Sequence, residues 1–508
     1  MDKFKELLTK SNYLTSFFTC SILFLIFLIL IQTLISRFSR NGKLLRKIPT
    51  PPTFPLLGNG PIFLAPLKYW PRIISWMCTW CGPTFCVDAV FKSFIFTKEP
   101  EVIKKILPFT RHSDKAFVYK MGHFYLGENA IVTAPVSIWK ADRKVVNPGL
   151  NTISNFPKFL ESFNENGKRL ADRLFSNNDT RKGRDIYVDL FQTTTEIVFE
   201  TMFDYPIHDK PDIAHDIAKA AINCSDVAKS KLIRPWINIP PTAYLLGYTK
   251  VIKENVAMFR KHFNQIHCKM LADDKRSVKF TSYLHLLYEQ RLATCDKLDV
   301  DELFYQFNTI IMGGTEVPST VLRIVLYLIA LYPEVQLKLR EEIEAIFGIG
   351  ADFDVKLEDV GRLKYMDLVL KESMRLLPAT PLHGRCVGED VDIGQGRIIP
   401  KGTSVHFLAW DIHNDPEIWE NPKIFNPDRF LPENLIGRDP YAYLPFSHGP
   451  RSCPAQKFGN MELKVLLCQI LAKLEVSTDL KLEDVRYTYG IVLHFDGVGL
   501  PVRFRKLD

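Results

Sequence analysis

The sequence has few cysteines for its length, and they lie far apart. Ten in 508 residues is well below the density of a disulfide-rich scaffold. Cys78 and Cys81 form a C-x-x-C pair, but no second pair and no histidines at ligand spacing accompany it. Two ordinary thiols are therefore expected there rather than a zinc or redox site.

The sequence also lacks internal repeats, low-complexity tracts and long charge blocks, which argues against repeat and disordered architectures. Hydrophobic residues make up 46% of the chain, enough to bury a large core. No shift in composition divides the chain after position 60. Residues 61–508 are therefore expected to form one large domain.

The positive charge of the chain is concentrated near its amino terminus. The formal net charge is +8, and five of these charges come from one short stretch without acidic residues: Arg37, Arg40, Lys43, Arg46 and Lys47. Because this stretch directly follows an apolar run, it is typical of a membrane flank and not of a nucleic acid-binding surface. Nucleic acid is therefore not an expected partner.

The apolar run extends over 26 residues without a charge, from Ser11 to Ser36. A helix needs about 20 apolar residues to cross a bilayer, so this segment is long enough. It lacks the short apolar core and cleavage site of a signal peptide and the polar face of a core helix. Residues 1–36 are predicted to form a single-pass membrane anchor, followed by a basic, proline-rich linker over 37–60. The positive-inside rule places the rest of the chain in the cytosol.

Helical periodicity dominates the rest of the chain. It predicts four helices near the candidate site: Asp301–Leu331, one from Pro333 to about Phe347, Lys364–Leu377 and Ala455–Leu474. Strand-like patterns are shorter: Thr84–Phe96, Val391–Ile399 and Tyr487–Phe504. The predicted fold class is mostly α with small β-sheets.

The most specific pattern is the run FSHGPRSCPA, from Phe446 to Ala455. It suits a thiolate that binds iron beneath a flat macrocycle. Phe446 would shield the sulfur, Gly449 would allow a tight turn, and Arg451 would reach a haem propionate. The helix expected after Cys453 would lower the pKa of the thiol through its positive amino-terminal end.

This run resembles the signature of the cytochrome P450 superfamily, F-x-x-G-x-R-x-C-x-G, in every fixed position except the last, where Ala455 replaces glycine. Glu372 and Arg375 match the E-x-x-R helix of the family, which ends 78 residues before the cysteine, and the run FNPDRF matches its arginine loop. Since Glu372 and Arg375 share one helix face, Arg429 of that loop is expected to complete a charge-paired triad. The resemblance covers about residues 45–505.

The resemblance implies the cytochrome P450 fold, with non-covalently bound haem b and Cys453 as the iron ligand. Trp139 and Arg143 match the W-x-x-x-R helix of the family, and Arg385 matches another of its arginines, so all three are expected near haem propionates. The runs LGENAIVT and LKYMDLVLKE look most like insect members of the microsomal clan that contains the fatty-acid ω-hydroxylases. The implied location is the endoplasmic reticulum membrane.

The oxygen-binding helix of the family usually reads A/G-G-x-D/E-T-T, and here the matching run is GGTEVP. Gly313 and Gly314 are expected to clear space above the iron, and Glu316 to serve as the catalytic acid. Val317 takes the place of the alcohol that helps to protonate bound oxygen. Pro318 lacks an N–H, so the helix should kink and free the carbonyl of Gly314 to hold a water.

The same run bears on haem attachment and on proton delivery. Some relatives tether haem through a glutamate at the position of Gly313, so this chain is expected to bind haem without that bond. Thr320 is a candidate to replace the missing alcohol, because it lies about one helical turn beyond Val317.

The resemblance implies a monooxygenase that inserts one oxygen atom into a lipophilic substrate. Its electrons would come from NADPH through cytochrome P450 reductase, with cytochrome b5 as a further candidate partner. The missing alcohol leaves two alternatives open: an isomerase or dehydratase that acts on a lipid hydroperoxide without reductase, and a haem-binding protein without catalysis.

Two further sets of residues are assigned from the resemblance. The apolar pocket walls are expected to include Ile310, Leu382, Ile491 and Leu493. Such residues do not distinguish fatty acids, terpenoids, pheromone-like lipids and xenobiotics. On the cysteine side of the haem, an acidic reductase surface is expected to meet Lys140, Lys144 and Lys457.

Overall fold

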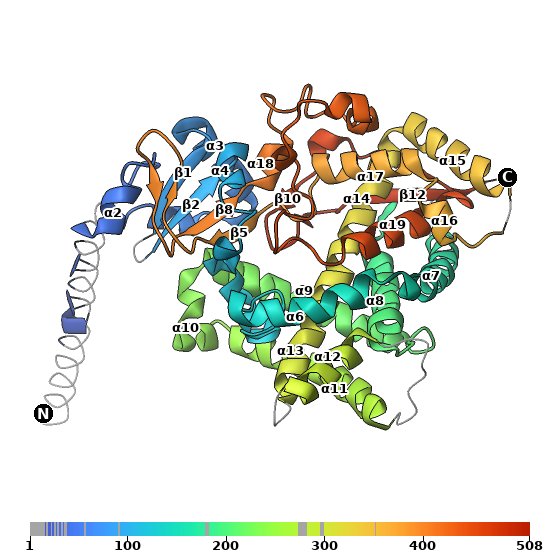
Figure 1. The fold of residues 1–508 in the computed structure, drawn as a ribbon, viewed down its shortest axis with the longest axis horizontal. Helices are drawn as coiled ribbons and strands as arrows, with labels where there is room; N and C mark the ends of the chain where they lie inside the picture. The colour runs from blue at the N-terminus through green and yellow to red at the C-terminus, as the bar shows by residue number, and fades with distance from the viewer. Residues whose placement is uncertain are drawn as a thin grey trace, which may run out of the picture.

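In the described residues, a large helical body carries four small β-sheets (Figure 1). The computed structural model describes residues 38–507 except 55–56, 90–91, 178–181, 273–281, 295–298 and 351, together with isolated positions between 16 and 34. The largest sheet lies toward the amino-terminal end of the molecule, whereas β12 (Pro501–Lys506) lies near the carboxyl terminus. Helices α13 (Val300–Ile311) and α14 (Val317–Leu331) run through the middle of the helical body. The predicted class, mostly α with small sheets in one large domain, is confirmed.

The helices of the described residues are α2 (Arg40–Leu45), α3 (Trp70–Cys81), α4 (Pro100–Lys104), α5 (His123–Leu126), α6 (Val136–Asn151), α7 (Phe156–Ser176), α8 (Tyr187–Phe203), α9 (Pro211–Ile233), α10 (Pro240–Leu245), α11 (Tyr248–Ala272), α12 (Tyr283–Thr294), α13 (Val300–Ile311), α14 (Val317–Leu331), α15 (Pro333–Phe347), α16 (Leu357–Val360), α17 (Lys364–Leu376), α18 (Ala409–His413) and α19 (Gln456–Leu471). Short 3-10 turns connect several of them.

The four predicted helices are present, with two differences. The segment predicted as Asp301–Leu331 is divided into α13 and α14 by a π-helical segment, Met312–Glu316. The last helix ends at Leu471 instead of Leu474, because the following residues form β9, which pairs with β12. Pro333 opens α15 as predicted, in the first turn where a missing N–H costs no hydrogen bond.

The strands of the described residues are β1 (Thr84–Ala89), β2 (Lys92–Thr97), β3 (Asp114–Lys115), β4 (Arg184–Asp185), β5 (His383–Cys386), β6 (Val391–Asp392), β7 (Ile398–Ile399), β8 (Ser404–Phe407), β9 (Leu474–Ser477), β10 (Tyr487–Thr488), β11 (His494–Phe495) and β12 (Pro501–Lys506). Their sheets have the orders β1-β2-β8-β5-β3, β4-β12-β9, β10-β11 and β6-β7. In the largest sheet β2 and β8 are parallel, and the other pairs are antiparallel.

Each predicted strand is a set of shorter strands. Thr84–Phe96 is the antiparallel pair β1 and β2, and Val391–Ile399 is the pair β6 and β7. Tyr487–Phe504 contains β10, β11 and β12, of which the last belongs to another sheet. Left-handed turns at Gly394, Gly497 and Gly499 reverse the chain where the strand-like composition predicted continuity.

The main core holds α19 against α7. Phe458, in the first turn of α19, meets Phe159 and Phe163 of α7 edge-on, with ring centroids 5.1 and 5.0 Å apart. Edge-to-face aromatic pairs add stability beyond the apolar area that they bury. Because Phe458 lies five residues after Cys453, this packing also fixes the end of the cysteine loop, which is the run from Phe446 to Ala455.

Most of the predicted anchor, residues 1–36, lies outside the described residues. The positions described between 16 and 34 are helical, and the side chains of Phe24 and Phe27 are exposed. Within the described part of the chain, one helix is long and apolar enough to cross a membrane, Val300–Leu331. It is mostly buried in the protein body, so it is a core helix.

Candidate active site

The cysteine loop is held by its own backbone and by a neighbouring turn. The N–H of Cys453 donates to the carbonyl of Phe446 over 2.9 Å. Gly449 has a φ of +79°, and a Cβ there would lie 1.9 Å from the carbonyl oxygen of Leu107. The predicted role of Gly449 in a tight turn therefore agrees with the structure, and the close approach of Leu107 adds a second reason for glycine.

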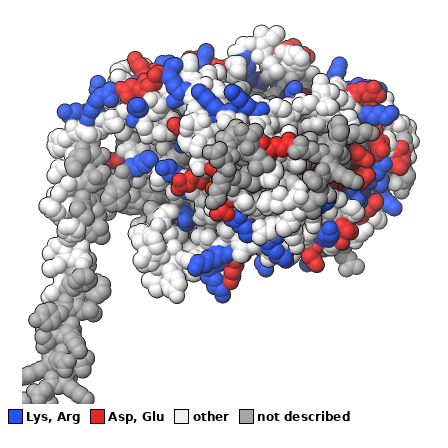
Figure 2. Space-filling view, turned by 60° about the horizontal axis from the view of Figure 1, so that its bottom comes forward, with Lys and Arg blue, Asp and Glu red and all other residues white. Residues whose placement is uncertain are grey.

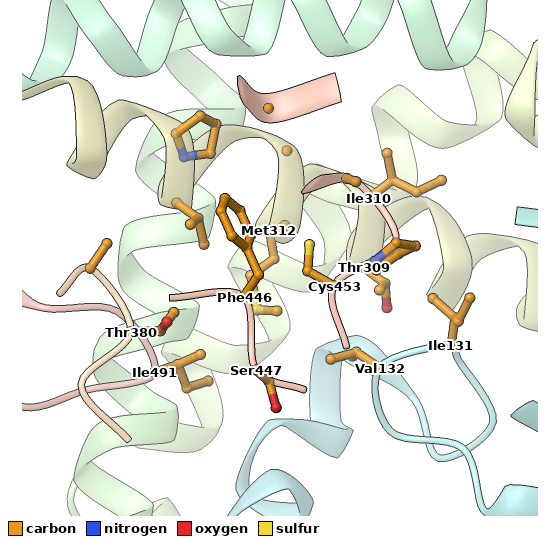
Figure 3. A pocket seen from close by; sticks show the side chains of 18 of the residues that line it. Ile131, Val132, Thr309, Ile310, Met312, Thr380, Phe446, Ser447, Cys453 and Ile491 are labelled. Atoms are coloured by element: carbon orange, nitrogen blue, oxygen red, sulfur yellow. The ribbon is translucent and has the colours of Figure 1, made fainter. Parts of the chain in front are cut away.

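The loop forms one wall of a cavity of about 380 Å³. The opposite wall comes from α13, the π-helical segment and the start of α14, and Figure 3 shows Ile310 and Met312 around the same space as Cys453 and Phe446. The predicted wall residues Ile310, Leu382 and Ile491 line the cavity. Leu493 does not; it is buried in a separate core cluster beside the largest sheet.

One part of the cavity wall is strongly cationic. Lys115, Arg143 and Arg451 line it, beside the indole of Trp139. The guanidinium of Arg451 lies 5.0 Å from the Trp139 ring centroid and donates to the carbonyl of Ala134 over 2.6 Å. Burial lowers the pKa of Lys115 well below its usual value and that of Arg451 to about 9. Cations that are buried together in this way call for an anionic ligand.

Arg385 lies behind this wall, in β5. It donates to the hydroxyl of Ser447 over 3.1 Å and to the carbonyl of Arg451 over 3.2 Å, and it is not among the residues that line the cavity. The sequence predicted Arg385 near a haem propionate, and this stays a prediction. Its side chain also braces the cysteine loop, because β5 turns it toward Ser447 and the Arg451 carbonyl.

These residues fit haem b. Cys453 presents a soft sulfur donor to the cavity, and Arg143 and Arg451 each keep a buried Nε atom without a hydrogen-bond partner. A Cβ on Gly313 would meet no other atom within 4 Å, so that side of the cavity is open above the sulfur wall. Cys453 would hold the iron, and Lys115, Arg143 and Arg451 would hold the propionates.

The thiol of Cys453 is affected by opposing influences. Burial raises its pKa, whereas the backbone N–H of Ala455 and the charges of Arg143 and Lys115 lower it. The sequence predicted that the following helix would lower the pKa overall, and in the structure burial is the larger effect. A bound metal cation deprotonates a coordinating thiol. The positive charge of the iron would therefore lower the pKa of Cys453 enough to offset burial, which the helix terminus alone does not do.

The predicted charge-paired triad is present beneath the loop. Nε of Arg375 donates to Glu372 Oε2 over 2.7 Å, and Nε of Arg429 donates to Glu372 Oε1 over 3.2 Å. Glu372 and Arg375 are fully buried, and Arg375 also donates to the carbonyl of His413 over 2.7 Å. The triad therefore ties α17 to the arginine loop and to α18.

The predicted oxygen-binding helix, called the distal helix below, comprises α13, the π-helical segment and α14. It is irregular, but not in the form of a simple kink. Residues Met312–Glu316 adopt π-helical geometry directly before Pro318, so the helix widens where the proline N–H is missing. A Cβ on Gly314 would lie 2.7 Å from Val198 Cγ2 of α8. Gly313 thus leaves the cavity open, whereas Gly314 allows α8 to approach.

Hydroxyl groups hydrogen-bond to the carbonyls around this irregular turn. Thr315 Oγ1 donates to the carbonyl of Ile311 over 2.6 Å, and Ser319 Oγ donates to that of Glu316 over 3.0 Å. From α8, Thr194 Oγ1 donates to the carbonyl of Thr315 over 3.1 Å. The turn is therefore stabilised by side chains, as buried backbone groups require.

Glu316 does not line the cavity, although the sequence placed it there as the acid. Its Oε2 accepts a hydrogen bond from Ser225 Oγ of α9 over 2.8 Å. Burial raises the pKa of Glu316 to about 7, and the Ser225 hydroxyl opposes this. Val317 lines the cavity as predicted, and Thr320 is buried outside the cavity wall, where it hydrogen-bonds to Tyr187. The π-helical segment turns Glu316 away from the cavity.

The polar residues of the cavity that sequence analysis missed include Lys115, Thr309 and Glu462. Thr309 and Glu462 each have a buried oxygen without a hydrogen-bond partner, and burial raises the pKa of Glu462 well above its usual value. Lys115 reaches the cavity because β3 pairs with β5, which is a contact between distant parts of the chain.

The predicted thiols Cys78 and Cys81 lie together on α3. Cys78 is buried, and burial raises the pKa of both groups. In the described residues no group of three or more His, Cys, Asp or Glu is arranged to hold a metal ion.

Comparison with known proteins agrees with this geometry. A model of the family "Cytochrome P450" matches residues 48–497. The chain is 27% identical to cytochrome P450 4c3 of Drosophila melanogaster, across 100% of this chain and 97% of that protein. It is also 27% identical to cytochrome P450 4V2 of Mus musculus (95% and 94%) and to cytochrome P450 4c21 of Blattella germanica (90% and 93%).

These relatives include insect proteins, which agrees with the predicted affinity to insect members. The matched region contains the cysteine loop, the triad and the distal helix. The chain belongs to the cytochrome P450 family and is an oxidoreductase of the haem-thiolate monooxygenase class.

Proposed function

We propose that this protein is a membrane-bound monooxygenase that takes electrons from NADPH through cytochrome P450 reductase and oxidises a lipophilic substrate. The observation that supports this most directly is the position of Cys453, which faces an apolar cavity below the distal helix. When bound, thiolate-ligated haem supplies the electron donation that favours O–O cleavage. The residues of the chain bind and orient the substrate, exclude water and deliver protons.

The cavity wall favours an apolar substrate. Above the cysteine loop it is formed largely by aliphatic side chains, among them Ile310, Val317, Leu382 and Ile491. Such a wall orients a substrate by shape and keeps bulk water out, and it gives little selectivity between lipids of similar width. Fatty acids, terpenoids, pheromone-like lipids and xenobiotics therefore all remain candidate substrates.

Membrane attachment would bring the cavity close to such substrates. Tyr244, Leu245 and Leu246, at the end of α10, are 73%, 82% and 55% exposed, and Trp76 and Trp80 of α3 are 50% and 57% exposed. Figure 1 shows α3 and α10 at the end of the molecule where α2 lies. Exposed apolar side chains around an anchor support insertion into the membrane surface, so this end would face the endoplasmic reticulum membrane.

The proposed anchor is tested by removing residues 1–36. The shortened protein should leave the membrane fraction to a large extent and still give the red-shifted Soret band of the ferrous carbon monoxide complex. The band reports thiolate ligation, so its loss would mean that the segment belongs to the core of the protein.

The reductase would dock on the cysteine side. Lys140 and Lys144 of α6 are exposed one turn apart, and Lys457 is exposed in the first turn of α19. The side chain of Asn151 donates to the carbonyl of Pro454 over 3.1 Å and so ties α6 to the cysteine loop. Figure 2 shows basic and acidic side chains interspersed over one face of the body. The proposed docking contact is the small basic cluster of Lys140, Lys144 and Lys457 and not a whole basic face.

Charge reversal tests this docking site. Replacing Lys140 and Lys144 by Glu should slow electron transfer from reductase, and the effect should be larger at low salt than at high salt, because exposed charges are screened. Replacing Lys250 and Lys253 of α11 by Glu is the matched control, since these two lysines are at neighbouring helical positions far from the loop in sequence. A salt-independent effect at Lys140 and Lys144 would remove them from the docking site.

The proposed reaction is tested with the full chain, reductase and NADPH in phospholipid vesicles. A fatty acid, a terpenoid and a lipid hydroperoxide are offered separately, and we expect product that carries an atom from labelled dioxygen and that requires both reductase and NADPH. Rearrangement of the hydroperoxide without reductase would favour the isomerase alternative, which the absence of an alcohol at Val317 also suits. A thiolate spectrum with no product in any assay would favour haem binding without catalysis.

A further inference from the structure

A buried carboxyl group lies directly behind the distal wall of the cavity. Glu316 is 1% exposed, and the next residue, Val317, lines the cavity. Oε2 of Glu316 is hydrogen-bonded to Ser225, but Oε1 is buried without a hydrogen-bond partner. A buried oxygen without a hydrogen-bond partner reduces the stability of the folded protein, so a functional reason for this atom is expected.

His494 faces this oxygen from the β10–β11 hairpin. Its Nε2 lies 3.8 Å from Glu316 Oε1, and its side chain is 20% exposed. The ring packs against Gly490, because a Cβ on that residue would lie 3.0 Å from His494 Cδ2. Gly490 itself lines the cavity. His494 therefore contacts solvent on one side and approaches the buried carboxyl group on the other, just behind the cavity wall.

Other titratable groups near Glu316 are less suited to exchange protons with solvent. They are Cys224, Asp226 and Lys229 of α9, Tyr125 of α5 and Tyr187 of α8, and Arg323 of α14 also faces His494. Asp226 and Lys229 form an ion pair of 2.7 Å, and burial raises the pKa values of the thiol and of both phenols. Asp226 is more exposed than His494, at 53%, but it is paired with Lys229. His494 combines partial exposure with an approach of 3.8 Å to Glu316 Oε1.

The protonation states of the pair suit a relay near neutral pH. Burial raises the pKa of Glu316 to about 7, and burial, together with the charges of Lys229 and Arg323, lowers that of His494 to about 4. The carboxyl group thus gains and loses its proton near neutrality, while the imidazole is neutral. A neutral imidazole accepts a proton at one nitrogen and releases one from the other, so it transmits protons without holding a charge.

We propose that His494 is the relay through which Glu316 regains its proton from solvent during turnover. This role rests on the monooxygenase function proposed above, in which a substrate RH, O2, two electrons and two protons give ROH and water. The His494 Nε2–H bond breaks as the Glu316 Oε1–H bond forms, and Nδ1 takes a proton from solvent. The 3.8 Å separation is closed by a small movement of either side chain or by one bridging water.

Hydrogen–deuterium exchange of the Glu316 carboxyl group tests this relay without turnover. Infrared spectra of the full-length haem-loaded protein are recorded after transfer to D2O, and the Glu316 band is identified by its absence in Glu316→Gln. In His494→Gln the exchange of this band should slow by at least about tenfold, because the glutamine amide is a poor acid and base. Each variant must first show the thiolate spectrum of the ferrous carbon monoxide complex.

The matched control is a second His–Glu contact outside the cavity. On α12, Nε2 of His285 lies 3.4 Å from Oε1 of Glu289, and the His285 side chain is 22% exposed. His285→Gln should leave exchange of the Glu316 band unchanged. Ser225→Ala, which alters the carboxyl group but keeps His494, should also retain fast exchange.

The two proposals fail in different ways. Unchanged exchange in a folded His494→Gln protein would overturn the relay, whatever the reaction is. Slowed exchange in that variant, with no reductase-dependent oxidation by the wild type, would support the relay as a proton route and overturn the function proposed above. Slowing by a similar factor in His285→Gln would also overturn the relay, because it would show that exchange follows a general opening of the protein.

Discussion

The two faces of the cavity are built in different ways. On the cysteine side, the ionic groups of the triad are paired with one another, and Glu372 lies between Arg375 and Arg429. On the distal side, Glu316 has one paired oxygen and one unpaired oxygen, and the helix around it is π-helical. The first face holds a ligand in one position, and the second leaves a titratable carboxyl oxygen without a fixed hydrogen-bond partner.

This difference follows from what each face has to do. A metal ligand must be held in place, and a buried charge network that is fully satisfied is rigid. Proton delivery requires groups that change their bonds during turnover, and π-helical segments occur often at such functional positions. The cavity thus joins a rigid support to an adaptable wall.

The largest effect is expected from removing the iron ligand on the rigid face. Cys453→Ser should abolish the red-shifted Soret band of the ferrous carbon monoxide complex, because an alcohol cannot replace a soft thiolate. Cys81→Ser is the control, since Cys81 is a partly exposed thiol of α3 outside the cavity wall. Retention of the band in Cys453→Ser would refute the assignment of the iron ligand.

Breaking the triad should be nearly as damaging. Glu372→Ala leaves two guanidinium groups without their shared carboxylate, one of them fully buried and the other largely buried, which should reduce the free energy of unfolding by about 3 to 5 kcal/mol. Denaturant unfolding followed by loss of the Soret band measures this. The control is Glu101→Ala, because Glu101 and Lys104 have the same i, i+3 spacing on the surface, where a loss below about 0.5 kcal/mol is expected. Similar losses at both sites would mean that the triad has no special structural role.

The rigid face could be predicted from sequence because its parts are local. FSHGPRSCPA is one continuous loop, and Glu372 and Arg375 are one helical turn apart, so these short motifs, together with the resemblance to the family, predicted their arrangement. The contacts of Arg385 with this face were not visible in any short motif. Its strand is paired with β3 and β8, and this pairing between distant segments determines that its side chain reaches Ser447.

The adaptable face was predicted less well because several distant elements form it. The apolar Val317 lies on the cavity wall as predicted. The direction of Glu316 depends on the π-helical segment, which shifts the helical phase and is not visible in a pattern of period 3.6. Its neighbours Ser225 and His494 come from α9 and β11, and no local motif connects them to GGTEVP.

Changes on the distal face should alter coupling more than binding. Glu316→Ala removes the buried proton donor and should lower the ratio of product to NADPH consumed by about tenfold. Val317→Thr restores a hydroxyl at the cavity wall and should raise that ratio by about twofold. Product, NADPH consumption and hydrogen peroxide release are measured together in each variant. An unchanged ratio in both variants would mean that protons reach the cavity by another route.

The smallest predicted effect is a shift in the pH dependence of that ratio. The pKa of Glu316 is about 7, so the carboxyl group is protonated and able to donate below pH 7, and coupling should fall as the pH rises through about 7. The Ser225 hydroxyl donates to the carboxylate and lowers this pKa. Ser225→Ala should therefore move the fall in coupling to higher pH, by about one unit.

A second serine provides the control for this shift. The hydroxyl of Ser319 donates to the backbone carbonyl of Glu316 over 3.0 Å and not to its carboxyl group. Ser319→Ala should therefore leave the midpoint in place, whereas Ser225→Ala moves it. Because the two variants remove the same hydroxyl group beside the same residue, a midpoint that moves equally in both would show a general change in the packing of the distal helix. A shift confined to Ser225→Ala would identify Glu316 as the group whose protonation sets the coupling.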